Sequence, residues 1–508
     1  MRRPGPHFLY YLVLAVLAIP GAVIGTATPS SSSPSVSRSV LALSRWAKEQ
    51  GIVMHENLQF KEYPSTSCDD EGGASSNWGP ELKEPVPPGT VLLQVPRKLV
   101  LESKSLEEEF QPIYTEEQLE KAMNELSGRG SQKGRADFGI HQDNFWIFLK
   151  LLRITRQCNY ANTYLMEQNE NVNSDIARRW SPWIHALPKD FTVFTKEEQE
   201  CLPFYANYAA QYQEQKFEAF CRAAAALGEL EMDENDSNKY NKEQQNLLFW
   251  AFNAVASRFW KTQPPVKRSD LKPWTEMVPI GDMFNHREPP NVEVMSKLPG
   301  SVDFVYRGDG KETDLYITYG QPNNPHRFLV IFGFVPSEED MPTVWSHLTL
   351  ADNPFSVQVP QMSFRTKDGR IPKMVWDAIL YALKPPPQGN NIPPIYTEKD
   401  HANPSVQKYS RQVLENHVAK ELAELATLRE KLNVLKTKRT DSSSSSSKNA
   451  NNNGSSHSID LISQHNDLLT KVFTRVQTHL KETSDQDTNS IMIGNDELVI
   501  TRNDQMKS

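Results

Sequence analysis

Apolar residues recur every three or four positions through the middle of the chain, from about residue 104 to residue 262. Residues with this spacing lie on one face of an α-helix, so the pattern predicts a long helical segment. Its clearest helices are expected at residues 145–156, 214–230 and 244–260. The predicted buried face of the last one consists of Leu248, Ala251, Val255 and Phe259.

Strand patterns lie on both sides of this helical segment. Before it, a Pro-Gly turn leads into a β-rich run at residues 87–101, where Pro96 limits a strand to an edge position or to its ends. After it, short alternating runs separated by Gly, Pro and Asp predict strands at residues 291–295, 303–307 and 314–320. The order β, helical insertion, β predicts one unit of the α+β class.

Two amphipathic helices are predicted toward the C-terminal end, at about residues 405–438 and at residues 459–482. Their expected apolar stripes consist of Leu414, Val418, Leu422, Leu425, Leu428, Leu432 and Leu435, and of Ile462, Leu469, Val472, Val476 and Leu480. The Ser- and Asn-rich residues 440–458 cannot bury apolar surface and are expected to be a disordered linker. An antiparallel helix pair is the simplest packing. A short hairpin is predicted at residues 490–502.

Composition narrows the class of partner. The 508-residue chain has a net charge of −8, so it lacks the basic surface expected of a nucleic-acid binder. A protein or a small molecule is the expected partner. The four cysteines, which form no C-x-x-C pair, favour buried thiols over a zinc cluster or a disulfide scaffold.

The N-terminal segment has the build of a targeting sequence. Residues 1–27 combine Arg2 and Arg3 with an apolar run that is short for a membrane span, which predicts a secretory signal peptide. Residues 28–39 are Ser-rich and lack acidic residues, as transit peptides do. Together they resemble the address of proteins of complex plastids. The alternatives are retention in the ER lumen, secretion, or an uncleaved signal anchor; after cleavage, no stable membrane span is expected.

Five short motifs occur in a distinctive order. They are PPGTVLLQVPRKLVL (residues 87–101), VASRFW (255–260), VPIGDMFNH (278–286), ITYG (317–320) and NNPHRFLVIFGFV (323–335). In this order, and with strands and helices at these places, the chain resembles the SET-domain methyltransferases of the Rubisco large-subunit lysine methyltransferase type.

The resemblance implies a fold and its boundaries. It implies a β-rich SET domain at residues 40–340 with a knot-like crossing and the helical insertion at about 104–262. Residues 341–508 are then expected to form an α-helical substrate-binding domain that includes the linker. The implied partner is a protein with a target lysine, and a monomer is expected.

The resemblance also implies S-adenosylmethionine as cofactor and names residues that would hold it. Asn285 and His286 would contact the cofactor, and Asp282 would brace the turn before them. Arg258 would meet the cofactor carboxylate, which a guanidinium fork matches bidentately. Gly79 would let the backbone approach the cofactor.

Tyr319 lies where the family has its catalytic tyrosine. Methyl transfer from a sulfonium is an in-line displacement, so the site must align a neutral amine and exclude water, and it requires no metal. Trp260 and Phe332 are expected to line the channel for the substrate side chain. The family's histidine-modifying branch has Asn at the position of Trp260, so an aromatic residue there favours lysine.

Two departures from the family pattern keep alternatives open. The glycine-flanked turn before the first strand is NWG (residues 77–79), and the acidic turn before the catalytic strand is KETD (residues 311–314). If these changes weaken cofactor binding, the chain is a non-catalytic SET-fold binding module. Protein-histidine methylation is another alternative. A metal hydrolase built on Asp282, His286 and His326 lacks a known ligand spacing.

Overall fold

The structure is a computed structural model of the whole chain. It describes residues 38–63, 77–127, 139–165, 174–188, 191–230, 242–262, 273–320, 324–346, 362–372, 375–376, 379–380, 403–445 and 454–483. The predicted signal peptide, nearly all of the Ser-rich segment after it, and the hairpin predicted at residues 490–502 lie outside these ranges.

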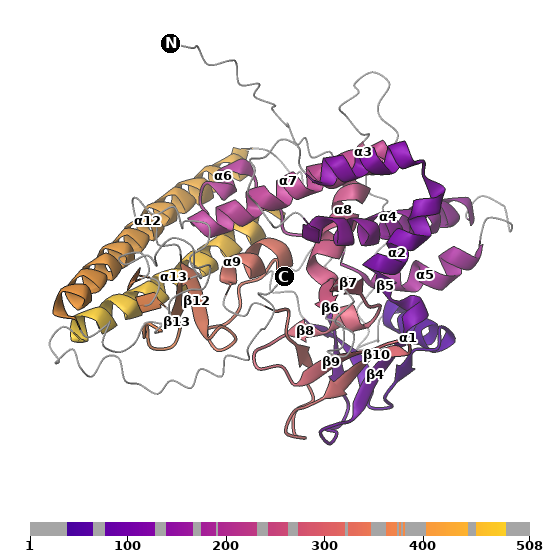
Figure 1. Cartoon of the computed structure of the whole chain (residues 1–508), viewed down its shortest axis with the longest axis horizontal. Coiled ribbons are helices and arrows are strands. Elements are labelled where there is room, and N and C mark those ends of the chain that lie inside the picture. Colours follow the sequence, from indigo (N-terminus) through magenta and orange to yellow (C-terminus); the bar gives the residue numbers. More distant parts are fainter. Residues whose placement is uncertain are drawn as a thin grey trace, which may run out of the picture.

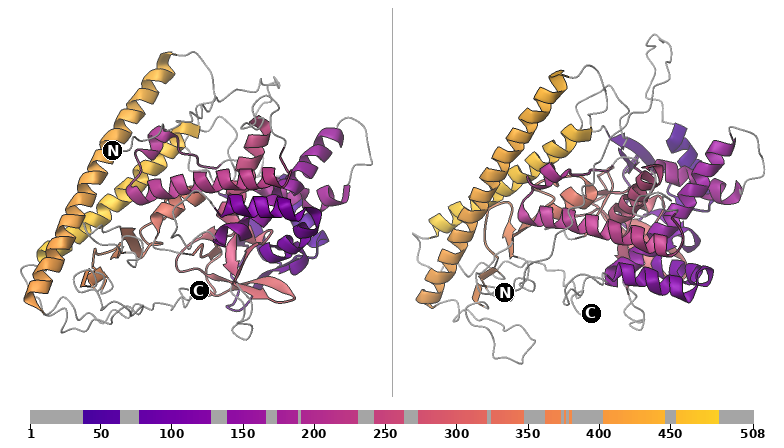
Figure 2. Two further views of the ribbon diagram at one scale, coloured as in Figure 1. Left: turned by 45° about the horizontal axis from the view of Figure 1, so that its top comes forward. Right: turned by 90° about the horizontal axis from the view of Figure 1, so that it is seen from above.

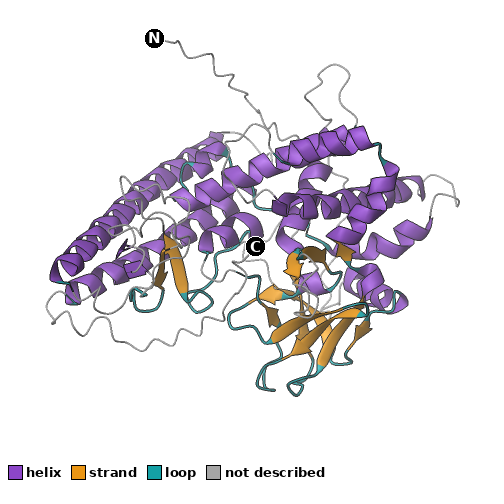
Figure 3. Ribbon diagram, viewed as in Figure 1, coloured by secondary structure: helices purple, strands orange, loops and turns teal. Residues whose placement is uncertain are grey.

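The described residues form a strand-rich part, a helical part above it, and a pair of long helices at one side (Figure 1). Most strands gather in the strand-rich part, and one small strand pair lies beside the two long helices (Figure 3). The α+β class predicted from the sequence is therefore confirmed. Within the described ranges, no helix combines the length and the apolar character that a membrane span needs.

The main sheet is antiparallel and has the strand order β1-β4-β10-β9, in which β4 pairs with a strand some 200 residues later in the chain. Its register places Ser301 opposite Pro96 and Phe304 opposite Leu93. Smaller sheets have the orders β2-β3, β5-β7-β6 and β11-β8. The strands are β1 (Val53–Met54), β2 (Leu58–Tyr63), β3 (Asn77–Leu82), β4 (Val91–Pro96), β5 (Leu101–Glu102), β6 (Trp260–Thr262), β7 (Trp274–Met277), β8 (Asn285–His286), β9 (Val292–Lys297), β10 (Ser301–Tyr306) and β11 (Tyr316–Ile317).

The helical insertion is present where the sequence predicts it, between β5 and β6. Its described helices are α2 (Ser103–Phe110), α3 (Glu116–Leu126), α4 (Gly139–Leu165), α5 (Ser174–Ala186), α6 (Lys196–Gln199), α7 (Phe204–Ala226) and α8 (Lys242–Arg258), and α1 (Arg38–Glu49) precedes the strands. On α8, Leu248, Ala251 and Val255 are buried as predicted, and Phe259 is half-buried just beyond its end.

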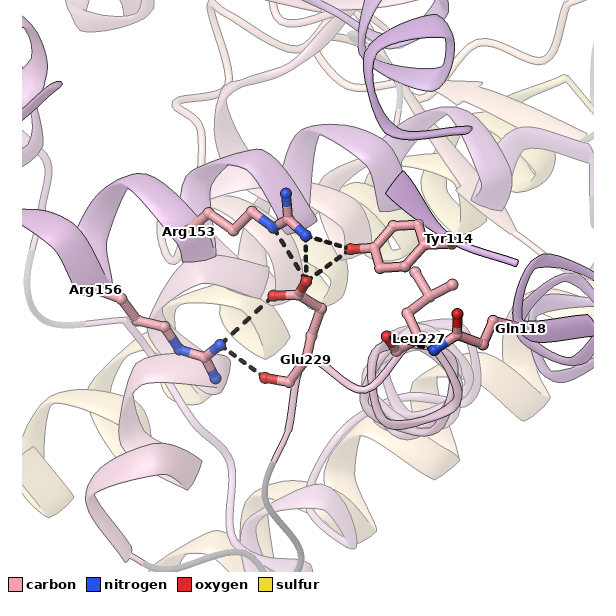
Figure 4. A network of polar contacts seen from close by, with 6 residues as sticks. All are labelled: Tyr114, Gln118, Arg153, Arg156, Leu227 and Glu229. Atoms are coloured by element: carbon pink, nitrogen blue, oxygen red, sulfur yellow. Dashed lines mark hydrogen bonds and ion pairs between the residues drawn. The ribbon is translucent and has the colours of Figure 1, made fainter. Parts of the chain in front are cut away.

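A polar network fixes the C-terminal end of α7 (Figure 4). The Glu229 carboxylate accepts hydrogen bonds from the Tyr114 hydroxyl, at 2.7 Å, and from Arg153 Nε, at 3.1 Å. Arg156 Nη1 donates to the Glu229 carbonyl oxygen at 2.7 Å, and Gln118 Nε2 donates to the Leu227 carbonyl oxygen at 3.3 Å. Burial and the Glu229 carboxylate raise the pKa of Tyr114 above its ordinary value, so its hydroxyl stays a donor. The network joins the end of α7 to α4, to α3 and to the segment before α3.

The long C-terminal helices are α12 (Pro404–Ser445) and α13 (Gly454–Glu482), and they lie side by side in both views of Figure 2. Ion pairs join Arg429 to Asp467 and Lys436 to Asp460. The residue numbers therefore increase along α12 in the direction in which they decrease along α13. This confirms the antiparallel pair. The helix α12 extends to Ser445, and α13 begins at Gly454. Both helices therefore enter the range 440–458 that was predicted to be a linker.

The C-terminal part also contains strands that the sequence analysis did not predict. The strands β12 (Thr343–Ser346) and β13 (Met362–Arg365) form an antiparallel pair. Val344 and Phe364 from this pair share an apolar cluster with Leu414, Val418 and Val472 of the two long helices. The strand pair therefore covers the helix pair on one face.

The helix pair is anchored to the insertion through α6. The buried Glu198 carboxylate accepts hydrogen bonds from Arg439 Nη1, at 2.9 Å, and from the Ser458 hydroxyl, at 2.5 Å. Asn466 Nδ2 donates to the Cys201 carbonyl oxygen at 3.1 Å. Because a buried carboxylate is costly unless it is paired, Glu198 holds α12 and α13 in one position against the insertion.

Gly369 marks a close approach between the turn after β13 and α13. Its φ is +68°, and a Cβ atom there would lie 2.4 Å from the Arg475 carbonyl carbon and 2.5 Å from the Val476 nitrogen. Gly51 has a φ of +80° with open space around it. Both glycines have a positive φ, but only Gly369 is crowded. Comparing an alanine substitution at each position therefore distinguishes the cost of backbone strain from that of steric overlap.

We expect Gly369→Ala to lower the free energy of unfolding by about 2–5 kcal/mol, because it adds overlap with a helix backbone to the strain of a left-handed residue. Gly51→Ala, the control, should cost only the strain, about 1–2 kcal/mol. Urea unfolding followed by circular dichroism measures both. Equal losses in the two variants would contradict the close packing of this turn on α13.

Candidate active site

The candidate site is built on two very short strands. β8 and β11 pair in parallel, with Asn285 opposite Tyr316 and His286 opposite Ile317. Parallel neighbours so far apart in the chain need a long connection, which here contains β9 and β10. The pairing brings the Asn-His motif and the segment that ends in Tyr319 together, as the predicted crossing requires.

Tyr319 is held against the Asn-His segment by two hydrogen bonds. Its hydroxyl donates to the Phe284 carbonyl oxygen at 2.8 Å, and its backbone N–H donates to His286 Nδ1 at 3.1 Å. Its ring centroid lies 4.8 Å from that of Phe332. Burial raises the pKa of Tyr319 to about 12, against a lowering effect of Arg258. The phenol is therefore protonated at neutral pH.

His286 is a neutral imidazole with a defined tautomer. Because Nδ1 accepts from Tyr319, the ring proton lies on Nε2. Burial lowers the pKa of His286, which keeps the ring uncharged. Nε2 is itself buried and has no hydrogen-bond partner among the described residues. A buried N–H group of this kind is available to donate to a molecule bound beside it.

Asp282 lies in the turn that precedes β8. The buried carboxylate accepts from Trp183 Nε1 at 3.2 Å. Burial raises the pKa of Asp282 to about 6, although Arg258 and the hydrogen bond from Trp183 favour the charged form. The turn is unusual, because Ile280, just before it, has a φ of +71°. A β-branched residue is rarely found there, so the surrounding core must impose this conformation.

Arg258 ends α8 and points into the site. Its Nη1 donates a short hydrogen bond to the Asp282 carbonyl oxygen, while its Nε is buried without a partner among the described residues. The side chain is half-buried. It is therefore not an exposed charge at a helix end, which is the ordinary alternative for a C-terminal arginine.

The two aromatic residues predicted to line the substrate channel differ in their surroundings. Phe332 lies directly against the Tyr319 ring. Trp260, the first residue of β6, packs edge-on against Phe304, with 6.1 Å between ring centroids. Phe304 in turn stacks on Phe284, whose carbonyl oxygen receives the Tyr319 hydroxyl. Phe332 thus contacts Tyr319 directly, and Trp260 is connected to it through two other rings.

The sequence analysis was wrong about the backbone at residues 77–79. These residues lie inside β3, where Gly79 pairs with Lys61, and none of them has a positive φ. A G-x-G-like turn is therefore absent at this place, since strand pairing with β2 extends the backbone here. The strand β3 still contacts the turn Gly281–Met283, so Gly79 belongs to an element that borders the site.

The acidic segment KETD supports β11. Glu312 accepts hydrogen bonds from Arg287 Nη2, at 2.6 Å, and from Asn291 Nδ2, at 2.8 Å. Asn291 Oδ1 accepts from the Tyr316 backbone N–H at 2.8 Å. Although the segment departs from the family pattern, its glutamate fixes the strand that leads to Tyr319.

The sequence analysis missed residues that complete the site. Phe328 stacks on His286 with 4.6 Å between ring centroids, and Phe334 lies 6.4 Å from the Tyr319 ring. Both belong to the motif at residues 323–335, in which the spacing of the phenylalanines was a usable signal. Trp183, the hydrogen-bond donor to Asp282, lies 99 residues away in the chain, and no sequence pattern marks it.

The residues of the hydrolase alternative do not form one group. Asp282 faces Trp183, His286 faces Tyr319 and Phe328, and His326 lies against Tyr205 and His465. Within the ranges that the structure describes, no three His, Cys, Asp or Glu side chains lie close enough to share a metal ion. The geometry gives this alternative no support.

Comparison with known proteins finds no matching family model and no matching curated protein. Among solved structures, the chain is similar to Rubisco LSMT bound to AdoMet, with 12% identity, a TM-score of 0.48, and coverage of 88% of this chain and 92% of that one. It is also similar to the SET domain of LSMT bound to lysine and AdoHcy, with 13% identity, a TM-score of 0.46, and coverage of 89% and 92%. These structures are of the protein class that the sequence motifs resemble.

Asp282→Asn should remove the pH-dependent effect of the Asp282 carboxyl on the free energy of unfolding. Because burial raises the pKa of Asp282 from 3.8 to about 6, the folded chain binds a proton there in this window that the unfolded chain has released. The stability of the unchanged chain relative to Asp282→Asn should therefore fall as pH rises from 3.8 to about 6, by up to about 3 kcal/mol, and stay level above it.

Urea unfolding at a series of pH values measures this difference. The control is Asp309→Asn at an exposed site, where Asn can keep the hydrogen bond from the Lys311 backbone N–H. If the difference in the free energy of unfolding between the unchanged chain and Asp282→Asn does not vary with pH, the pKa of Asp282 is the same in the folded and the unfolded chain.

Proposed function

We propose that this chain is an S-adenosylmethionine-dependent protein-lysine N-methyltransferase in which Tyr319 is the catalytic residue. The observation that carries the proposal is the position of the phenol. The parallel β8–β11 pair holds the Tyr319 hydroxyl 2.8 Å from the Phe284 carbonyl oxygen, next to the Asn-His segment. A protonated phenol and a backbone carbonyl at one point are suited to orienting an amine for in-line attack.

The residues present fit the cofactor. Two buried N–H groups, at Arg258 Nε and His286 Nε2, have no partner among the described residues, and both border the turn at Asp282. We assign Arg258 to the cofactor carboxylate, and Asn285 with His286 to its adenosyl part. Asp282 acts through the turn Gly281–Met283, and Gly79 acts through strand β3. Both elements border the proposed cofactor site. When bound, the cofactor supplies a methyl group on a positively charged sulfur.

Tyr319 has the right hydrogen-bonding capacity to position the amine. A hydroxyl has one donor and two acceptor positions. The donor is used by the Phe284 carbonyl oxygen, so the phenol oxygen can accept an N–H of the substrate amine. The amine lone pair then stays free for the methyl carbon. Ring faces around the phenol keep the amine poorly hydrated, which lowers the pKa of a lysine from its usual value of about 10.4.

The substrate, in this proposal, is a protein that docks on the α12–α13 helix pair and presents its target lysine to the aromatic channel of Phe332 and Trp260. The chain acts as a monomer. It enters the secretory pathway through its signal peptide and reaches a complex plastid, where cofactor and protein substrate meet. Mass spectrometry of proteins from that compartment, after incubation with the chain and isotopically labelled cofactor, tests the substrate class.

The second candidate function is a non-catalytic binding module. It is favoured by one observation, the absence of a turn at residues 77–79, where strand β3 replaces it. Calorimetry with S-adenosylhomocysteine separates the two functions, since the enzyme binds it and the module does not. Histidine methylation would be supported if Trp260→Asn raised the activity of the chain toward a histidine peptide that the unchanged chain already modifies.

Tyr319→Phe should reduce the methyl-transfer rate about 100-fold or more, because the amine loses the acceptor that aligns it. Affinity for S-adenosylhomocysteine should be nearly unchanged. Tyr316→Phe is the matched control, since Tyr316 lies in β11, three residues before Tyr319, and its ring stacks on Arg287. Single-turnover methyl transfer and calorimetry measure the two quantities. Normal turnover in Tyr319→Phe would remove the phenol from the mechanism.

Asn285→Ala should weaken the binding of S-adenosylhomocysteine about tenfold, because a half-buried polar contact is lost. Calorimetry measures the dissociation constant, and Asn433→Ala on the exposed face of α12 is the control. Unchanged affinity in Asn285→Ala would count against its assignment to the cofactor.

A further inference from the structure

Trp183 joins the helical insertion to the turn that contains Asp282. It lies near the C-terminal end of α5 and is fully buried. Its Nε1 lies 3.2 Å from one oxygen of the Asp282 carboxylate and 3.4 Å from the other. A buried carboxylate holds an N–H donor tightly, because water does not compete for it. The indole therefore fixes the direction in which the Asp282 side chain points.

Asp282 also contacts Arg258, but only through its backbone. Arg258 Nη1 donates to the Asp282 carbonyl oxygen, and Arg258 Nε is buried without a partner among the described residues. No ion pair joins this guanidinium to the Asp282 carboxylate, although both groups lie within the described ranges. A guanidinium and a carboxylate that are held away from water attract each other strongly. The direction of the carboxylate therefore decides whether Arg258 stays unpaired.

The indole is itself held in place by other parts of the core. Trp46 Nε1, on α1, donates to the Arg179 carbonyl oxygen at 2.5 Å, about one turn before Trp183 on α5. The Trp183 ring packs against that of Trp180, with 5.6 Å between their centroids. The indole thus has a fixed position, and the Asp282 side chain is the partner that can turn.

Rotation of the Asp282 side chain would change how Arg258 is paired. A staggered side chain has three preferred positions about its first torsion, and Arg258 already contacts the backbone of the same residue. The indole is the side-chain donor to this carboxylate among the described residues, so without it the carboxylate would turn to the guanidinium. Arg258 paired in this way would no longer offer its N–H groups to another carboxylate.

We propose that Trp183 is a positioning residue that holds the Asp282 carboxylate away from Arg258, and so keeps the guanidinium available to the carboxylate of S-adenosylmethionine. This inference rests on the proposed methyltransferase function. It gives the helical insertion a role in cofactor binding, through a residue that acts on Arg258 by way of Asp282. The role concerns only the carboxylate end of the cofactor, since the adenosyl part is assigned to Asn285 and His286.

Two ligands distinguish this role from a general support of the fold. S-adenosylhomocysteine has the carboxylate, whereas methylthioadenosine has the same adenosyl group and sulfur atom without it. The proteins are the unchanged chain, Trp183→Phe, Asp282→Asn, the variant with both changes, and Trp180→Phe. Trp180 is a buried residue of the same helix without a hydrogen bond to Asp282 in the described structure, so Trp180→Phe is the matched control.

Calorimetry at about pH 8 gives each dissociation constant with Asp282 ionised, since its pKa is about 6. Thermal unfolding checks that each variant is folded at the temperature of the calorimetry. If Trp183→Phe does not fold, Trp183→Met takes its place, because a flexible methionine adapts to an irregular space and also lacks the N–H donor.

Trp183→Phe should weaken the binding of S-adenosylhomocysteine about tenfold, as expected for one charge-assisted contact, and leave that of methylthioadenosine nearly unchanged. Adding Asp282→Asn should restore most of the lost affinity, because a neutral amide competes only weakly for Arg258. Trp180→Phe should alter the affinity for neither ligand.

Three results would overturn the inference. An equal loss for both ligands in Trp183→Phe would show a loosened fold and not a paired Arg258. Unchanged binding of S-adenosylhomocysteine in a folded Trp183→Phe variant is the second result. The third is a selective loss in Trp183→Phe that Asp282→Asn does not relieve.

A comparison without ligand separates this inference from the proposed function. If Asp282 pairs with Arg258 once the indole is removed, Arg258→Met should lower the urea midpoint of Trp183→Phe more than it lowers that of the unchanged chain. Equal shifts would overturn the inference. An unchanged chain that binds neither ligand would contradict the proposed function, and the urea midpoints would then decide whether Trp183 holds Asp282 away from Arg258.

Discussion

The parallel pairing of β8 with β11 is the constraint on which the candidate site depends. Each strand has two residues, so their own hydrogen bonds are too few to define the register. The surroundings supply what the pair lacks: Asn291 and Glu312 hold β11, and the core imposes a positive φ on Ile280 before β8. Because side chains alternate between the two faces of a strand, a shift of one residue would move the Tyr319 hydroxyl away from the Phe284 carbonyl oxygen.

Electrostatics around this pairing favour neutral groups at the reacting position. Arg258 donates to a backbone carbonyl oxygen and not to the Asp282 carboxylate, so its positive charge is only partly compensated. The carboxylate has Trp183 as its side-chain donor, and burial raises its pKa. The phenol of Tyr319 and the ring of His286 are uncharged at neutral pH. A protonated amine brought among these groups would be disfavoured, whereas a neutral one, as the proposed methyl transfer requires, would not.

The sequence predicted the parts of the fold that follow from local periodicity. The faces of α8, α12 and α13 are buried as expected because amphipathic spacing is a property of the helix itself. The pairing of residues 77–79 with β2 depends on a partner strand and was mispredicted as a turn, and β12 with β13 went unnoticed for the same reason. In the site, the motifs located Tyr319 and the Asn-His pair. Trp183 could not be found, because its hydrogen bond to Asp282 exists only after α5 packs on the core.

One helix joins the site to the C-terminal helices. The five-residue π-helix Phe328–Phe332 presents Phe328 to His286 and Phe332 to Tyr319, while Leu329 lies in an apolar cluster with Phe194, Leu432 and Ile462. A π-helix has a wider turn than an α-helix, and such turns are common at functional sites. Because packed cores transmit displacements, α12 and α13 cannot move relative to the insertion without disturbing the rings beside the phenol. The position of the helix pair therefore affects the geometry of the site.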